Sequence, residues 1–261
     1  MKLRGILAVL ALLSGCATNP ITGRDQIIAL PAMQAAHADF SFAVATGVQG
    51  IGAAPACGRD CANAEYLADF ARRVTAISAR LEKAARDIGP DLFDRIGGFE
   101  VETSDALGVG TGSSAGGRIV LGTGLAALEP SDVVIGFLVA REMAHVIARH
   151  AEENSGASIV FAALGILLPG FNFIARFVAT KLGANALAGS WELQQQREAD
   201  EIAMTLLEHA GITARTVALE LGIGIKRARL PDDEWGRRYL ESANYVESIA
   251  ASPPRYATID R

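Results

Sequence analysis

Apolar residues recur at intervals of mostly three and four in a long segment that starts at residue 67. This spacing places them on one face of an α-helix, and Gly89 and Pro90 directly after the segment are typical of a helix end. The sequence therefore predicts an amphipathic helix, whose apolar positions are Leu67, Phe70, Val74, Ile77, Leu81 and Ile88.

Two short segments further on have the character of β-strands. Residues 99–103 alternate between apolar and polar side chains, and residues 118–121, Arg-Ile-Val-Leu, form a second short strand. The segment between them, LGVGTGSSAGG, is rich in glycine. A strand rather than a helix follows these glycines, so the context of a dinucleotide-binding loop is absent. We expect the segment to be a flexible hairpin connection.

Two further helices are predicted in the second half of the chain. Ser131 is a favourable N-cap and Asp132 suits the positive end of the helix dipole, so a helix should start there and continue to about Glu153. A second helix is expected from Trp191 to Ala210, with His209 in its last turn. Gly211 follows it and is a common helix stop.

Residues 156–175 carry no charged side chain, and the run is long enough to span a bilayer. Pro169, Gly170 and Asn172 interrupt it. A pair of buried helices or a hairpin that dips into a membrane is therefore favoured over a spanning helix.

Length and charge exclude some classes of function. A chain of 261 residues suits one compact domain. Its formal net charge is -5, and its Lys and Arg residues are scattered rather than clustered. We therefore expect no nucleic-acid partner.

The N-terminus has the pattern of a secretion signal. Lys2 and Arg4 precede an apolar run that ends in small residues before Cys16. The sequence Leu-Ser-Gly-Cys at residues 13–16 resembles a bacterial lipobox, in which the cysteine is lipidated and becomes the new N-terminus. The alternative is an ordinary signal peptide with an incidental cysteine. Residues 1–15 are thus expected to be a lipoprotein signal peptide, residues 16–35 a lipid anchor and extended tether, and residues 36–261 a single domain.

By resemblance to Gram-negative sorting, Ala17 after the lipidated cysteine favours the periplasmic face of the outer membrane. Two further cysteines, Cys57 and Cys61, lie four residues apart. An even pair in an oxidising compartment indicates a disulfide, and two unpaired thiols remain the alternative.

The stretch Arg141-Glu142-Met143-Ala144-His145 has the spacing of a zinc-protease helix with one change. In an H-E-x-x-H sequence the two histidines hold zinc from one side of a helix, and the glutamate acts as general base. Here arginine takes the place of the first histidine. A guanidinium stays protonated and has no lone pair to offer, so Arg141 cannot coordinate zinc.

Several pieces of the sequence, taken in order, resemble a known family. They are the lipobox, NPITGRDQ, GRIVLGTGL, HVIARH, QREADEIAM and HAG. Together they resemble the Ste-twenty-four and HtpX-like zinc metallopeptidases of peptidase family M forty-eight, in particular periplasmic lipoprotein members. The resemblance implies a mainly helical α+β zincin-like metallopeptidase fold with a small β-sheet, and a metallopeptidase-like domain over residues 36–261.

The resemblance also assigns the site. A downstream E-x-x-x-D supplies the third zinc ligand through its Glu and an outer carboxylate through its Asp; Gln196 and Asp200 stand in these positions here. His145 is the ligand that is kept, and Glu142 is a vestigial general base. No cofactor is expected, and zinc is the metal to expect if the site works after all.

His145 and His150 are five residues apart, about 140° around a helix, so we expect them to point in different directions and not to share a metal. We further hypothesise that Arg141 is a built-in cation in place of zinc. Its guanidinium would then satisfy Asp200, Glu142 and the side-chain oxygen of Gln196.

The sequence favours a catalytically inactive outer-membrane lipoprotein that binds envelope proteins or unfolded polypeptides. One alternative is an active metalloendopeptidase in envelope protein quality control, with a non-standard metal site. The other is a membrane-associated scaffold. In the scaffold alternative the apolar segment 156–175, for instance, would lie against the membrane, and lipidated Cys16 is the expected membrane contact of the protein.

Overall fold

The computed structural model describes residues 16–19, 21–28, 31–50, 62–155, 192–228 and 230–251. Helices dominate these residues, with a small sheet beside them, as the α+β prediction requires. The elements are β1 (Cys16–Thr18), β2 (Asp25–Ile27), α2 (Pro31–Gly50), α3 (Ala62–Ile88), α4 (Asp91–Ile96), β3 (Glu100–Ser104), η1 (Asp105–Leu107), β4 (Thr111–Ser113), β5 (Arg118–Gly122), η2 (Thr123–Leu128), α5 (Asp132–Ile147), α9 (Leu193–His209), α10 (Ala214–Arg227) and α11 (Glu234–Ala251).

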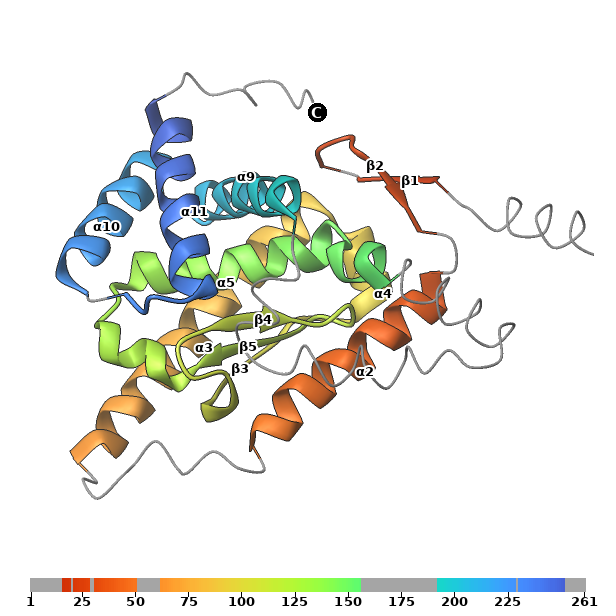
Figure 1. The fold of residues 1–261 in the computed structure, drawn as a ribbon. Helices are drawn as coiled ribbons and strands as arrows, with labels where there is room; N and C mark the ends of the chain where they lie inside the picture. The colour runs from red at the N-terminus through yellow and green to blue at the C-terminus, as the bar shows by residue number, and fades with distance from the viewer. Residues whose placement is uncertain are drawn as a thin grey trace, which may run out of the picture.

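Helix α5 is the centre of the molecule. Every one of its residues from Val134 to Ile147 is buried. Figure 1 shows it between the three-stranded sheet and α9, with α3 packed against it as well. A helix that is buried all round can carry polar side chains only where partners are provided inside the protein, and this is where the candidate site lies.

The helices predicted at both sides of the candidate site are confirmed. α3 contains the predicted segment 67–88 and starts earlier, at Ala62. The Ser131 side chain accepts a hydrogen bond from the Val134 backbone N–H at 3.3 Å, so Ser131 is the N-cap of α5. α9 lies within the predicted range 191–210, and Gly211 follows it with a φ of +80°. Helices α2, α4, α10 and α11 had no individual prediction.

The sheet differs from the prediction. Strands β3 and β5 pair in parallel, with Val101 opposite Ile119, and β4 pairs antiparallel with the other edge of β5. Parallel neighbours cannot be joined by a hairpin turn, so the expected hairpin connection was wrong. The glycine-rich segment, residues 107–117, instead contains the last residue of η1, the edge strand β4 and the tight turn that joins β4 to β5.

The helix that starts at Asp132 also ends earlier than predicted. α5 stops at Ile147, residues 148 and 149 form a turn, and helical residues resume at His150 and run to Ser155. Arg149 has a φ of +59°, which an α-helix does not allow. The continuous helix to Glu153 was therefore wrong, and the break changes the direction of the chain just before His150.

The segment expected to be an extended tether forms an antiparallel hairpin. Cys16 pairs with Ile27 and Thr18 pairs with Asp25. α2 begins at Pro31, so the expected boundary between residues 35 and 36 lies inside this helix. No described helix is long and apolar enough to cross a membrane. The cysteine pair Cys57 and Cys61 and the uncharged run 156–175 lie outside the described residues.

Candidate functional site

The structure brings the predicted site residues of α5 and α9 together in the interior. The two helices pack along each other. All five are buried, with exposures of 5% for Arg141, 3% for Glu142, 1% for His145, 4% for Gln196 and 1% for Asp200.

Arg141 and Asp200 form a buried ion pair. The Arg141 Nε lies 3.0 Å from Asp200 Oδ1, and the Ser242 hydroxyl of α11 donates to the same oxygen at 3.1 Å. Burial raises the pKa of Asp200 to about 6, although Arg141 and Ser242 act in the opposite direction. The arrangement agrees with the hypothesis that Arg141 supplies the cation in this part of the site.

Glu142 has other partners than the hypothesis expected. Its two carboxylate oxygens accept hydrogen bonds from Thr111 Oγ1 at 2.6 Å and Ser113 Oγ at 2.8 Å, both on strand β4. Burial raises the pKa of Glu142, while the two hydroxyls and the charge of Arg141 lower it. The guanidinium therefore does not hold this carboxyl group; the edge strand holds it.

His145 and His150 are in contact, which contradicts the expectation that they point apart. Their Nδ1 atoms are 2.8 Å apart, and the ring planes meet at 67°. The prediction assumed one continuous helix, and the turn at Ala148 and Arg149 removes that condition. Burial, His150 and Arg141 lower the pKa of His145 well below its usual value, so its ring is neutral at neutral pH.

The contact continues from His150 to Glu198 on α9. His150 Nε2 lies 3.1 Å from Glu198 Oε2, and His150 is fully buried. Burial raises the pKa of Glu198, but hydrogen bonds from His150, Thr22 and Arg24 outweigh it and bring the pKa down to about 2. Glu198 is therefore an anion at neutral pH, buried between the core and the N-terminal hairpin.

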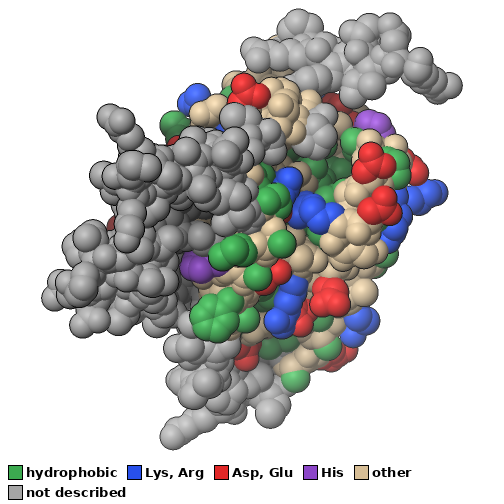
Figure 2. Space-filling model, turned by 90° about the vertical axis from the view of Figure 1, so that its right-hand side faces the viewer, with side chains coloured by type: hydrophobic (Ala, Val, Ile, Leu, Met, Phe, Trp, Pro, Cys, Tyr) green, Lys and Arg blue, Asp and Glu red, His purple; other side chains and the backbone are tan. Residues whose placement is uncertain are grey.

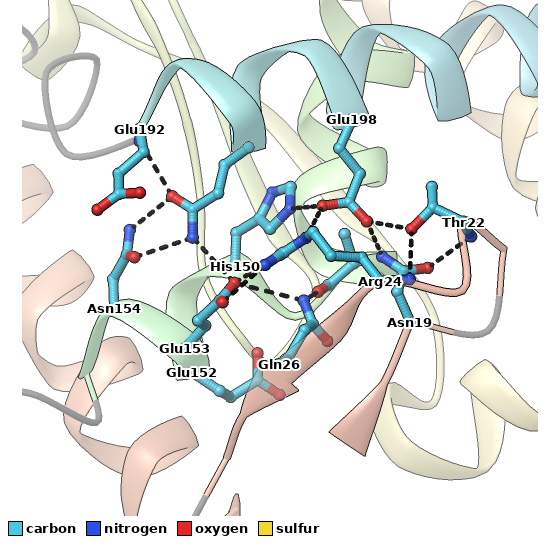
Figure 3. A network of polar contacts seen from close by, with 12 residues as sticks. Asn19, Thr22, Arg24, Gln26, His150, Glu152, Glu153, Asn154, Glu192 and Glu198 are labelled. Carbon is cyan, nitrogen blue, oxygen red and sulfur yellow. Dashed lines mark hydrogen bonds and ion pairs between the residues drawn. The ribbon is translucent and has the colours of Figure 1, made fainter. Parts of the chain in front are cut away.

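Figure 3 shows how the hairpin is fastened to this anion. The Arg24 guanidinium donates to Glu198 Oε2 at 2.6 Å and, through its two terminal nitrogens, to both carboxylate oxygens of Glu153 at 2.8 and 2.6 Å. Asn19 donates to Glu198 Oε1 at 2.6 Å. Gln26 donates to the Ala148 carbonyl, in the turn that follows α5. The hairpin therefore packs against the turn at Ala148 and Arg149 that ends α5.

Sequence reasoning missed several contributors to the site, among them Ser242 and Arg24. His150 and Glu198 lie within the motifs HVIARH and QREADEIAM but had no predicted role. Thr111 and Ser113 lie in the glycine-rich segment that was expected to be a loop. A signal for them existed in the alternation of Thr111 and Ser113, which is the spacing of one face of a strand.

The donor set does not fit a zinc site of the kind that the sequence resemblance implied. Arg141 brings a positive charge and no lone pair, and Gln196 offers a neutral amide in place of a carboxylate. Within the described part of the chain, no group of three or more His, Cys, Asp or Glu side chains is arranged to hold a metal ion.

A hollow of about 420 Å³ lies between α9 and α11 and reaches the site from outside. Gln196 and Asp200 form part of its wall. Most of the other lining residues have polar or charged side chains; they are Leu193, Arg197, Arg238, Glu241, Ser242, Asn244, Tyr245 and Ser248.

Comparison with known proteins places this geometry in context. A family model described as Peptidase family M48 matches residues 71–246, more than half of the chain. Mitochondrial metalloendopeptidase OMA1 of Arabidopsis thaliana is 29% identical over 140 residues, which cover 50% of this chain and 28% of the relative. The chain thus matches less than a third of that relative's length. No solved structure matches the chain.

Proposed function

Because the chain belongs to peptidase family M48, we propose that it is a metallopeptidase-like protein that has lost zinc catalysis and acts by binding polypeptides. Its ligands would be envelope proteins or unfolded chains at the periplasmic face of the outer membrane, where lipidated Cys16 would anchor it. The observation that carries the proposal is the buried ion pair of Arg141 with Asp200.

The family's chemistry depends on a metal that activates water beside a general base. In this chain a permanent cation, 5% exposed, stands at the first ligand position and is paired with the carboxylate of Asp200. A zinc ion placed beside it would meet like charge, and desolvation would make that repulsion large. The carboxylate of Glu142 is also held at both oxygens by Thr111 and Ser113. These contacts support a loss of catalysis.

The binding role is supported by the hollow between α9 and α11. Its volume of about 420 Å³ suits a few residues of an extended chain, and its walls carry donors and acceptors that can pair with a peptide backbone. The Arg197 guanidinium lies over the Tyr245 ring, 5.4 Å from the ring centroid, so an aromatic ring and a cationic group both line the hollow.

The test of the lost metal is elemental mass spectrometry on the purified chain, beside the double variant Arg141→His with Gln196→Glu. We expect no zinc in the unmodified protein and close to one equivalent in the double variant, because the two changes restore an imidazole and a carboxylate to the ligand positions. Near-stoichiometric zinc in the unmodified protein would overturn the proposal. The single variant Arg141→His is the matched control and should gain zinc more weakly.

The binding role has a separate test. A photo-crosslinking side chain placed at Asn244, on the rim of the hollow, should form adducts with unfolded casein. The same side chain at Leu219, which is 62% exposed on α10 and lies outside the hollow, is the control. Equal labelling from both positions would contradict binding in the hollow, whatever the metal analysis gives.

A further inference from the structure

Helix α2 is apolar on two opposite sides. Its inner side is buried and includes Ala38 and Phe42, and Phe42 packs with Leu107 and Val120 in a small cluster of its own. The opposite side points away from the protein. Large exposed apolar faces usually mark a site of interaction, so the outer face calls for a partner.

The outer face is a continuous apolar stripe. Met33 is 56% exposed and Phe40 is 65% exposed, and Ala36 and Ala43 are exposed beside them. Their spacing of three, four and three residues places all four within one side of the helix. Figure 2 looks onto the side of the molecule where α2 and the hairpin lie in Figure 1, and it shows green hydrophobic side chains exposed among charged ones.

The helix carries almost no charge that would oppose burial of this face in lipid. α2 contains no Lys, Arg or Glu. Its one carboxylate, Asp39, turns toward the protein, where Oδ1 accepts a hydrogen bond from the Gly116 backbone N–H at 2.9 Å. His37 is half-buried at the edge of the stripe.

The hairpin fixes this helix close to the proposed lipid anchor. Cys16 pairs with Ile27 across the hairpin, and α2 begins four residues later at Pro31. Paired strands are about 5 Å apart and each residue spans at most about 3.6 Å, so the helix starts within about 20 Å of Cys16. Because Arg24 binds Glu153 and Glu198, the hairpin is held on the folded domain, and the short distance between Cys16 and α2 is fixed by the fold.

We propose that the outer face of α2, formed by Met33, Ala36, Phe40 and Ala43, lies in the interfacial region of the lipid bilayer. The proposal rests on the anchoring of Cys16 in the proposed function, because the anchor is what brings a bilayer to this face. An acyl chain and an apolar helix face together give firmer attachment than either alone. In Figure 1 the sheet and α5 lie between α2 and α9, so this orientation leaves the hollow beside α9 directed away from the membrane.

The test uses the full processed protein reconstituted in phosphatidylethanolamine and phosphatidylglycerol vesicles, with tryptophan as the probe. Phe40→Trp reports on the proposed face, and Leu219→Trp, at a similarly exposed position on α10, is the control. Fluorescence is compared in vesicles with and without lipids brominated on their acyl chains, and the signal of the native Trp191 and Trp235 is subtracted. We expect quenching of Phe40→Trp to exceed that of Leu219→Trp severalfold.

Equal quenching at the two positions would overturn the proposal. Mass spectrometry of the N-terminal peptide separates this result from a failure of the anchor. If Cys16 is acylated and Phe40→Trp is not quenched, the lipid anchor is confirmed and the proposal that α2 faces lipid is wrong. If Cys16 is not acylated, vesicles are added to the protein in solution, and the same comparison of Phe40→Trp with Leu219→Trp shows whether the outer face of α2 binds lipid. A dimer in detergent that Met33→Gln with Phe40→Gln dissociates would assign the face to a second copy of the chain and also overturn the proposal.

Discussion

Arg141 brings a permanent positive charge into a region that is otherwise built from carboxyl groups and imidazoles. It is 5% exposed, and its partner Asp200 is 1% exposed. A buried pair of this kind adds little stability compared with apolar residues of the same size, but breaking it by removing one partner is costly. The sequence alone predicted this contact, because the chemistry of a guanidinium excludes zinc and favours a carboxylate.

We expect Arg141→Ala to lower the free energy of unfolding by about 3–5 kcal/mol, because Asp200 would remain buried without its cation. Arg141→Lys should lose less, since an ammonium keeps the charge. Urea unfolding followed by circular dichroism gives both values. An unchanged midpoint for Arg141→Ala would contradict the role of Arg141 as the internal cation. Adding Asp200→Asn to Arg141→Ala should recover part of the loss, because the uncompensated charge is then removed.

At the level of elements, the short hairpin β1–β2 has more influence on the site than its size suggests. It reaches the core through Arg24 and Asn19, which bind Glu198, and through Gln26, which binds the carbonyl of Ala148. Glu198 in turn contacts His150, and His150 contacts His145. The first residues after the proposed anchor are therefore connected to the candidate site by three successive polar contacts.

Arg24→Met should detach this hairpin. The substitution keeps an apolar stem of similar length but leaves the carboxylates of Glu153 and Glu198 without their cation. We expect a loss of about 2–4 kcal/mol and faster proteolysis within residues 16–28. Thermal unfolding and limited proteolysis measure the two effects.

The matched control is Arg72→Met. Arg72 also pairs with a carboxylate, Asp69 at 3.0 Å, but its side chain is 67% exposed. Surface pairs of this kind contribute less than about 1 kcal/mol. If Arg24→Met and Arg72→Met had the same small effect, the hairpin would have to be held by its backbone contacts and not by the Arg24 clamp.

At the scale of the whole molecule, the main core and α2 are held by contacts of very different extent. The main cluster joins α3, α5, α9, α10 and α11 around fully buried side chains such as Phe137 and Leu206. The second cluster consists of Phe42, Leu107 and Val120. Regions with few buried apolar contacts open at a lower free-energy cost than the global unfolding transition.

Hydrogen exchange should reveal this difference. In detergent-free solution we expect the amides of α2 to exchange at least about tenfold faster than those of α5 and α9, because α2 can separate without disturbing the main core. Mass spectrometry of peptides from residues 31–50, 132–147 and 193–209 gives the comparison. Equal protection of all three would show that α2 belongs to the same cooperative unit as the core. Vesicles should slow the exchange of α2 selectively if its outer face binds lipid.

The sequence by itself determined the features that depend on local spacing and on the chemistry of single side chains. Apolar periodicity located α3, the N-cap Ser131 located the start of α5, and Gly211 located the end of α9. The guanidinium of Arg141 has no lone pair, so the sequence also excluded this residue as a zinc ligand. A local pattern does not show which distant segments will contact each other. The parallel pairing of β3 with β5 and the binding of the hairpin to α9 could therefore not be predicted from it.

The contact of His145 with His150 has the same explanation on a smaller scale. Five residues on one helix would separate the rings, and only the positive φ of Arg149 turns the chain and joins them. That backbone strain is supported by long-range contacts: Gln26 and Arg95 bind the carbonyls of Ala148 and Val146 at the helix end. The tertiary structure thus decided the geometry of the site, because Gln26 of β2 and Arg95 of α4, both far from α5 in the sequence, bind the carbonyls at the break.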